Sequence, residues 1–323
     1  MSSSAAAEIV FDRVTKRYEG REQAAVESLS LTIPAGEICV LVGPSGAGKT
    51  TAMKLVNRLI ELDEGDIRID GRSIRDQDAV QLRRSIGYVI QQVGLFPHMT
   101  IAENIATVPR LLGWPKKRTK ERVAELLELV GLEQDYAARY PAQLSGGQRQ
   151  RVGLARALAV DPPLMLMDEP FGALDPITRD RLQLEFLRLH DEVRKTVIFV
   201  THDIDEAIKL GDRIAILREG GHLAQYDTPD RILAHPADDF VARFVGADRG
   251  LKRLALRRLE EIELEPLDGA APAGPRAPGS TTLRDALSLM MSEGADPLVV
   301  VDAAGTPIGL LSVARVGRVL SEL

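Results

Sequence analysis

The chain has 323 residues, of which 45% are hydrophobic and 27% are charged. This length and composition predict a packed core, either in one large and one small domain or in two medium ones. The net charge of -6 argues against a uniformly basic surface for nucleic acid. The single cysteine, Cys39, excludes a disulfide framework and fits a reducing compartment. Because no run of about 18 apolar residues is present, we expect any membrane role to come through a partner.

Short apolar runs separated by turn residues predict strands in the first 200 residues. Between these runs, residues 119–160 carry a helical pattern in which Val123, Leu126 and Val130 share one face and Gly131 ends the helix. Strands that alternate with helices favour an α/β fold with a mainly parallel sheet. The expected strands are residues 9–11, 29–33, 38–42, 164–167 and 196–200, and residues 66–71 are expected to form a further strand and the turn that follows it.

The composition changes after about residue 245. Residues 249–258 carry five basic and no acidic side chains, for which a solvated helical face is favoured over contact with anionic lipid. Residues 266–280 are rich in Pro, Gly and Ala and predict a linker. Beyond the linker, a helix, two strands and a second helix are expected at residues 283–291, 298–301, 308–311 and 313–320.

The segment GPSGAGKT, from Gly43 to Thr50, matches the phosphate-binding pattern GxxxxGK followed by Ser or Thr. Its glycines let backbone N–H groups surround a polyphosphate, and the following helix offers its N-terminus to the negative charge. Lys49 would supply a positive charge to the β- and γ-phosphates, and Thr50 a hydroxyl to Mg²⁺. The expected nucleotide-binding residues are Gly43, Pro44, Ser45, Gly46, Ala47, Gly48, Lys49, Thr50 and Thr51.

Two acidic residues follow another predicted strand. Residues 164–167 are apolar and lead directly into Asp168 and Glu169. A buried strand that ends in Asp places a carboxylate at the carboxyl edge of the sheet, where nucleotides bind in such folds. We therefore expect Asp168 to hold Mg²⁺ and Glu169 to act as the general base for the attacking water.

A second anion-binding motif is the sequence LSGGQ, which begins a helical run at residues 144–148. A Ser hydroxyl and Gly amides would lie there at a helix N-terminus. The motif resembles the signature of the ABC ATPase family, and the resemblance covers residues 8–245. It implies ATP and Mg²⁺ as cofactors and an ABC ATPase domain with a mainly parallel core sheet, an antiparallel β subdomain and a helical subdomain. The nucleotide-binding residues that it implies here are Ser145, Gly146, Gly147 and Gln148.

The resemblance implies roles for further residues. Tyr18 resembles the aromatic residue that stacks on adenine. Gln91, or its neighbour Gln92, resembles the glutamine that contacts Mg²⁺ and the attacking water. Asp175 belongs to a segment similar to the loop that crosses the dimer interface. His202 follows the strand at 196–200 and resembles the histidine that contacts the γ-phosphate, which makes it a candidate catalytic residue beside Glu169 and Gln91.

In the family that the chain resembles, two ATPase subunits enclose two ATP molecules, each between one phosphate loop and the opposite signature. The resemblance therefore implies a homodimer in which Ser145 serves the nucleotide of the other subunit. It also implies integral membrane permease subunits, an external substrate-binding protein and a peripheral location at the cytoplasmic face of the membrane. No nucleic-acid partner is expected.

Residues 89–105, together with Leu112-Gly113-Trp114, resemble the osmoprotectant branch of the importers, which takes up glycine betaine, choline, carnitine or proline betaine. Residues 281–323 resemble a single CBS motif. The motif would either pair with its copy from the second subunit or be a remnant that binds no ligand. The predicted organisation is an ABC ATPase domain at 8–245, a basic segment and linker at 246–280, and the CBS-like segment at 281–323.

The same motifs are compatible with two other functions. An importer of methionine or another amino acid would carry the same ATPase motifs, because the permease and the binding protein choose the cargo. An ABC ATPase without a transport role is also possible. The heptad arrays, zinc-binding cysteine clusters and tandem cassettes of those proteins are absent from this sequence, so the importer is favoured.

Overall fold

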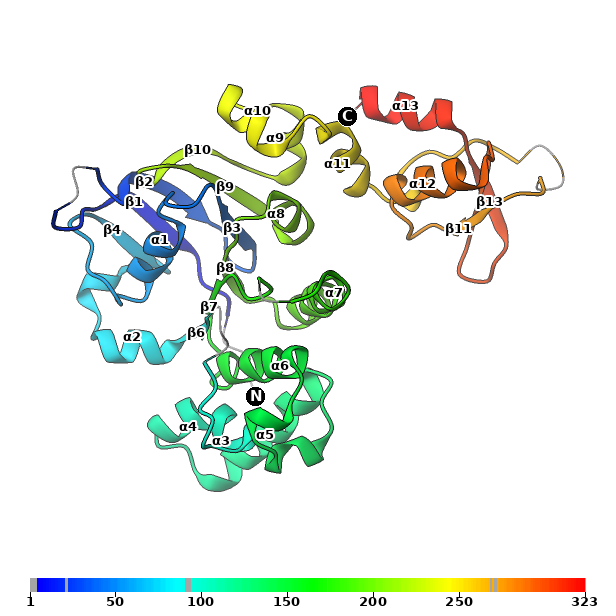
Figure 1. Cartoon of the computed structure of the whole chain (residues 1–323). Helices are drawn as coiled ribbons and strands as arrows, with labels where there is room; N and C mark the ends of the chain where they lie inside the picture. Colours follow the sequence, from blue (N-terminus) through cyan, green and yellow to red (C-terminus); the bar gives the residue numbers. More distant parts are fainter. Residues whose placement is uncertain are drawn as a thin grey trace. The chain divides into compact units, whose positions relative to one another are not determined.

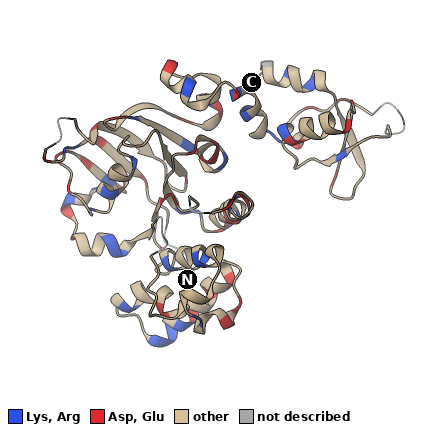
Figure 2. Cartoon of the chain, in the orientation of Figure 1, with Lys and Arg blue, Asp and Glu red and all other residues tan. Residues whose placement is uncertain are grey.

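The computed structural model describes residues 5–20, 23–90, 94–172, 174–267, 269 and 272–322. Contacts within the chain divide it into two compact units, Met1–Tyr226 and Asp227–Leu323. Among the described residues, none of the helices is both long enough and apolar enough to span a bilayer. Basic and acidic side chains are interspersed over the elements of both units (Figure 2), as expected for a chain of modest net charge.

The first unit is built around a six-stranded sheet with the strand order β10-β9-β3-β8-β7-β6 (Figure 1). Strand β3 pairs in parallel with β8 and β9, and β7 pairs in parallel with β6 and β8. Every residue of β3 and β8 is buried, which explains why their sequences are apolar except for Thr196 at the start of β8. The mainly parallel sheet predicted from the sequence is confirmed. Its strands are β3 (Ile38–Val42), β6 (Ile86–Val89), β7 (Leu164–Asp168), β8 (Thr196–Val200), β9 (Arg213–Arg218) and β10 (His222–Asp227).

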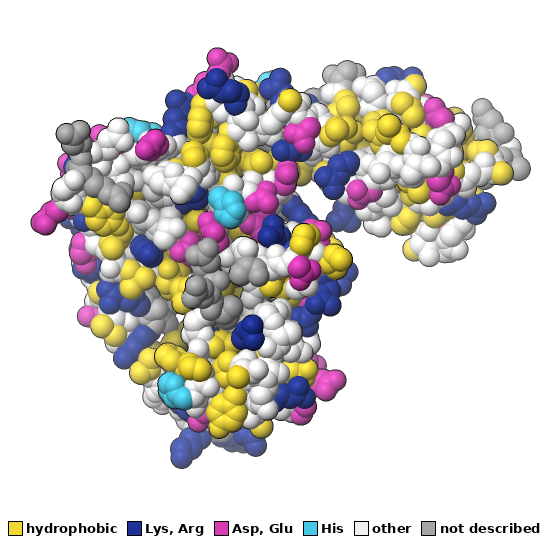
Figure 3. Space-filling view, in the orientation of Figure 1, with side chains coloured by type: hydrophobic (Ala, Val, Ile, Leu, Met, Phe, Trp, Pro, Cys, Tyr) yellow, Lys and Arg dark blue, Asp and Glu magenta, His cyan; other side chains and the backbone are white. Residues whose placement is uncertain are grey.

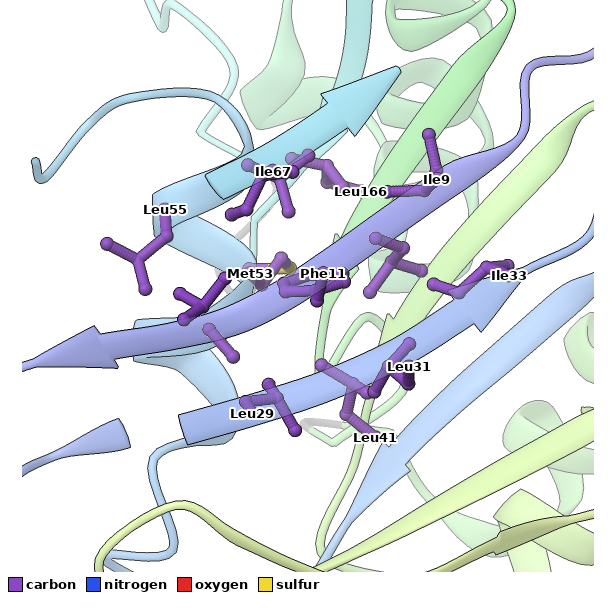
Figure 4. Packing of buried hydrophobic residues seen from close by; sticks show 14 of the residues in the cluster. Ile9, Phe11, Leu29, Leu31, Ile33, Leu41, Met53, Leu55, Ile67 and Leu166 are labelled. Carbon is purple, nitrogen blue, oxygen red and sulfur yellow. The ribbon is translucent and has the colours of Figure 1, made fainter. Parts of the chain in front are cut away.

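A second, antiparallel sheet has the order β2-β1-β4-β5. Its inner side chains, including Phe11 and Leu31, pack with Met53 of helix α1 (Lys49–Val56) and with Leu41 of β3 (Figure 4). Helix α1 follows the phosphate loop, so this cluster fixes the loop to both sheets. The strands are β1 (Ile9–Lys16), β2 (Val26–Ile33), β4 (Glu64–Ile69) and β5 (Arg72–Ser73), and they include the predicted strands in this region.

Helices α3, α5 and α6 pack against one another and form a helical region beside β6 (Figure 1). The predicted helical stretch 119–160 is interrupted, because Gly131 adopts φ 65° and two 3₁₀ turns follow, at Gln134–Ala138 and Pro141–Gln143. The helices of the first unit besides α1 are α2 (Ala79–Ser85), α3 (Ile101–Ile105), α4 (Thr107–Leu111), α5 (Lys116–Leu129), α6 (Gly146–Ala157), α7 (Pro176–Val193) and α8 (Ile204–Leu210).

The second unit contains a three-stranded sheet of order β11-β12-β13. The predicted helix-strand-strand-helix order after the linker is confirmed. The linker prediction is wrong at its end, because residues 276–278 form strand β11, which pairs in parallel with β12. The elements are α9 (Pro229–Ala234), α10 (Asp239–Val245), α11 (Arg249–Ala255), β11 (Arg276–Pro278), α12 (Leu283–Glu293), β12 (Leu298–Val301), β13 (Pro307–Leu311) and α13 (Val313–Glu322).

The basic segment is part of this second core. Leu254 of α11 is fully buried among the hydrophobic residues of α12, β12 and β13. Arg253 pairs with Asp230 at 3.1 Å and its side chain is only 11% exposed, so the predicted solvated face is wrong for this residue. Residues 227–245, predicted with the ATPase domain, group by contacts with the second unit. The predicted boundaries at 245 and 280 and the CBS resemblance stay predictions.

Candidate nucleotide-binding site

The phosphate loop leaves the carboxyl end of β3 and leads into α1. The Lys49 ammonium donates hydrogen bonds to the Gly43 carbonyl at 2.8 Å and to the Pro44 carbonyl at 2.9 Å. At two positions of the loop, any side chain larger than that of glycine would clash with a neighbouring backbone carbonyl. A Cβ on Gly43 would lie 2.2 Å from the Leu217 carbonyl oxygen, and one on Gly48, at φ 79°, would lie 2.0 Å from that of Ala25. The loop conformation is therefore restricted to glycine at both positions.

Two side-chain oxygen groups that could hold a metal, from Thr50 and Asp168, lie close together beside the loop. The Thr50 hydroxyl donates to the Asp168 carboxylate at 3.1 Å. Burial raises the pKa of Asp168, and the Thr50 hydrogen bond and Lys54 oppose that rise. Within the described residues, no group of three or more His, Cys, Asp or Glu side chains is placed to hold a metal. Mg²⁺ prefers oxygen ligands and usually keeps waters and phosphate oxygens alongside one or two protein ligands, so the Thr50–Asp168 pair fits it.

Glu169 and His202 face each other at the ends of neighbouring strands. His202 Nδ1 lies 3.1 Å from Glu169 Oε1. The Glu169 N–H donates to the Val200 carbonyl at 2.9 Å, and Glu169 adopts φ 44°, which turns the chain sharply after β7. The His202 side chain is 65% exposed and that of Glu169 is 22% exposed. Figure 3 shows histidine and acidic side chains gathered on this face near the ends of β7 and β8.

These groups surround one cavity of about 350 Å³. It brings together most of the phosphate loop with Tyr18, Glu169 and His202, as the sequence predicts, although the roles of these residues stay predictions. Ala25 also lines the cavity, and no sequence motif points to it. Gly43 and Pro44 contribute carbonyls to Lys49 instead of lining it. The lining residues are Tyr18, Ala25, Ser45, Gly46, Ala47, Gly48, Lys49, Thr50, Thr51, Glu169 and His202.

The signature motif lies at a separate cavity of about 280 Å³. Ser145 is the N-cap of α6: its hydroxyl accepts from the Gln148 N–H, and the Gln148 side chain accepts from the Ser145 N–H. This reciprocal capping box fixes the first turn of the helix. The cavity is lined by Gly131, Leu132, Glu133, Tyr136, Ser145, Gly147, Gln148, Arg151 and Arg181. Sequence reasoning missed Tyr136 and Arg181, which belong to no motif.

Two of the remaining predicted residues, Gly146 and Asp175, lie at helix starts outside both cavities, and a third, Gln91, is not described. Gly146 is the first residue of α6 and lies outside the lining of that cavity. Asp175 is the N-cap of α7 and accepts from the Thr178 N–H at 3.0 Å, a bond that holds the pKa of its carboxyl below its usual range. Gln91, like its alternative Gln92, lies outside the described residues.

A family profile described as ABC transporter matches residues 26–172. Over 91% of this chain and 75% of the relative, the sequence is 52% identical to the choline transport ATP-binding protein OpuBA of Bacillus subtilis. The chain belongs to the ABC transporter family as an ATP-binding subunit. This ABC ATPase is also 49% identical to the osmoprotectant import ATP-binding protein OsmV of Salmonella typhimurium, over 94% of this chain and 78% of the relative.

The fold of this ABC ATPase matches that of solved cassettes. A dimeric structure of the ATP-binding cassette MJ0796, in a post-hydrolysis state bound to ADP and phosphate, aligns with a TM-score of 0.60 and 36% identity. The alignment covers 68% of this chain and 98% of that one. Together with the family profile, this similarity shows the predicted ABC ATPase fold, with ATP as the nucleotide.

Proposed function

We propose that this ABC ATPase drives an importer of quaternary-amine osmoprotectants, such as glycine betaine, choline, carnitine or proline betaine. The observation that carries the ATPase part is the single cavity lined by the phosphate loop, Glu169 and His202. The cargo is supported by relatives whose names describe choline transport and osmoprotectant import, at 52% and 49% identity over more than nine tenths of the chain.

The proposed reaction is attack of water on the γ-phosphorus of ATP. Glu169 accepts the proton of the water as its oxygen bonds to phosphorus, the bond from the γ-phosphorus to the bridging oxygen breaks, and ADP and inorganic phosphate leave. Lys49 and the loop amides bind the phosphates. Mg²⁺, held by Thr50 and Asp168, would neutralise phosphate charge. The His202–Glu169 contact at 3.1 Å supports a role for His202 in orienting this carboxylate.

A homodimer is proposed because the two phosphate-binding elements of one chain lie at different cavities that share no lining residue. A signature helix can complete a nucleotide site only where its N-terminus reaches the phosphates. We therefore propose that Ser145 and Gln148 of one copy serve the ATP bound by the phosphate loop of the other. The dimeric state of the MJ0796 cassette, which has the same fold, supports this arrangement.

The proposed partners beyond the second copy are integral membrane permease subunits and an external substrate-binding protein. The importer names of the relatives support this assembly, which would hold the ATPase at the cytoplasmic face of the membrane. Because the permease and the binding protein select the cargo, an amino-acid importer with this same motor is the second candidate.

The test is uptake of radiolabelled glycine betaine or choline, with methionine as the competing cargo. Cells without their own osmoprotectant importers would express this chain with its neighbouring permease and binding protein, at low and high external salt. We expect betaine or choline uptake that rises with salt and disappears with Glu169→Gln. Uptake of methionine alone would keep the ATPase assignment and refute the osmoprotectant cargo.

A further inference from the structure

The Gln148 side chain makes hydrogen bonds at both ends of its amide. Its Oε1 accepts from the Ser145 N–H at 2.9 Å, which closes the capping box. Its Nε2 donates to the Tyr136 hydroxyl at 2.9 Å. An amide has one accepting and one donating end, so a flipped Gln148 would place Nε2 against the Ser145 N–H and lose the cap. The Tyr136 oxygen therefore supplies the acceptor that the capping orientation needs.

Tyr136 is itself held in place. It lies in the 3₁₀ turn Gln134–Ala138, and the guanidinium carbon of Arg139 lies 3.8 Å from its ring centroid. Arg139 also pairs with Asp135 of the same turn. A cation over an aromatic face is attractive, so the ring has little freedom to turn away. The hydroxyl is thereby presented to α6 from a segment outside the motif.

Tyr136 also shares a cavity with the signature. Tyr136, Ser145, Gly147 and Gln148 line the same space of about 280 Å³. The N-terminus of α6, a helix of twelve residues, carries partial positive charge there, and its first backbone N–H groups have no acceptor within the helix. These groups bind phosphate well only when their directions are fixed before the ligand arrives.

We propose that Tyr136 is a positioning residue for the signature motif. Its hydroxyl fixes the Gln148 amide, and Gln148 in turn fixes Ser145 and the first turn of α6 toward the nucleotide of the second copy. The inference rests on the proposed function of Ser145 and Gln148 in the dimer. No step of the chemistry is assigned to Tyr136, so its effect falls on dimer formation and not on ATP binding by the single chain.

The test is ATP-dependent dimerisation of the full chain carrying Glu169→Gln, measured by analytical ultracentrifugation across ATP concentrations. Tyr136→Phe keeps the ring and its contact with Arg139 but removes the acceptor oxygen. We expect the ATP concentration for half-dimerisation to rise about fivefold or more, as for loss of one hydrogen bond. Binding of a fluorescent ATP analogue to the dilute monomer should be unchanged.

The matched control is Tyr226→Phe, which removes the hydroxyl that donates to the Thr32 carbonyl at 2.7 Å, away from the signature. It should leave dimerisation unchanged, so an equal response of the two Phe variants would overturn the proposal. In a Gln148→Ala background, Tyr136→Phe should have no further effect. A further loss there would show that Tyr136 acts by another route and would also overturn it.

Two outcomes separate this inference from the function on which it rests. Ser145→Arg places a large side chain at the cap and should abolish dimerisation. If Ser145→Arg blocks the dimer while Tyr136→Phe does not, the inference fails and the proposed signature function stands. If Ser145→Arg still dimerises, or if the Glu169→Gln parent forms no dimer with ATP, the proposed function fails and the inference fails with it.

Discussion

His202 Nδ1 lies 3.1 Å from Glu169 Oε1, at the ends of the neighbouring parallel strands β8 and β7. The Glu169 N–H donates to the Val200 carbonyl at 2.9 Å, so a main-chain and a side-chain contact both locate this residue. A carboxylate with a fixed position can receive a proton from a water held at one place above the phosphate loop. The register of two strands thus sets the geometry proposed for hydrolysis.

Glu169→Gln tests that geometry most directly. An amide cannot accept the proton, so we expect the rate of phosphate release to fall by about 10²- to 10⁴-fold. ATP affinity should change little, because Lys49 and the loop glycines are untouched. Phosphate release and equilibrium ATP binding would be measured together. Glu192→Gln, which neutralises an exposed carboxylate of α7, is the control, and normal turnover in Glu169→Gln would mean that another group is the base.

Lys49→Ala should weaken ATP binding by about 10- to 100-fold, the size of one or two hydrogen bonds from a charged donor. The Lys49 side chain is buried and its ammonium donates to the Gly43 carbonyl of the loop, so its removal takes a positive charge from the lining of the cavity. Burial lowers the pKa of Lys49, and Glu169 and Asp168 counteract this. Isothermal titration calorimetry with ATP would measure the loss. Lys54→Ala, on the same helix, is the control, and an equal loss there would indicate a general charge effect.

Comparing Gly48→Ala with Gly46→Ala distinguishes the cost of a steric clash from the cost of backbone strain. Both glycines have positive φ, 79° for Gly48 and 84° for Gly46. A Cβ at Gly48 would lie 2.0 Å from the Ala25 carbonyl oxygen, whereas a Cβ at Gly46 would have no heavy atom within 4 Å. We expect Gly46→Ala to cost about 1 kcal/mol of unfolding free energy from backbone strain, and Gly48→Ala to cost clearly more. Thermal unfolding without nucleotide is the measurement, and equal losses would contradict the contact argument.

The sequence predicted the elements of the site where the signal is local. Strand β3 and residues 197–200 of β8 are continuous apolar runs because both faces of a parallel sheet are covered, and the phosphate loop is a contiguous motif. Tyr136 gave no such signal, since its hydrogen bond to Gln148 exists only after a 3₁₀ turn packs beside α6. The sequence likewise predicted an exposed Arg253, because its ion pair with Asp230 joins two helices and leaves no local pattern. Hydrophobic periodicity and motif spacing predict local elements, but they do not predict which side chains of separate elements are in contact.

Buried Glu206 makes stability depend on pH. It accepts from Gln183 Nε2 at 2.9 Å, and burial raises its pKa above the usual value of 4.5. Hydrogen bonds from Thr201 and Gln183 oppose this rise, Asp203 adds to it and Arg179 reduces it. The folded chain therefore retains a proton in a pH range where the unfolded chain has lost it. The contribution of this group to stability is fully present below about pH 4.5 and is lost as pH rises through the folded pKa.

Glu206→Gln should remove this loss, because the amide oxygen still accepts from Gln183 and carries no charge to bury. We expect the Tm of the variant, relative to that of the unmodified chain, to increase as pH rises from 4 to 8. Each kcal/mol of difference in unfolding free energy corresponds to roughly 2–4 °C in Tm. Glu206→Ala leaves Gln183 without its acceptor and should be less stable than Glu206→Gln at every pH. Differential scanning calorimetry across this range is the measurement. A Tm difference between Glu206→Gln and the unmodified chain that stays constant with pH would show that Glu206 titrates alike in both states.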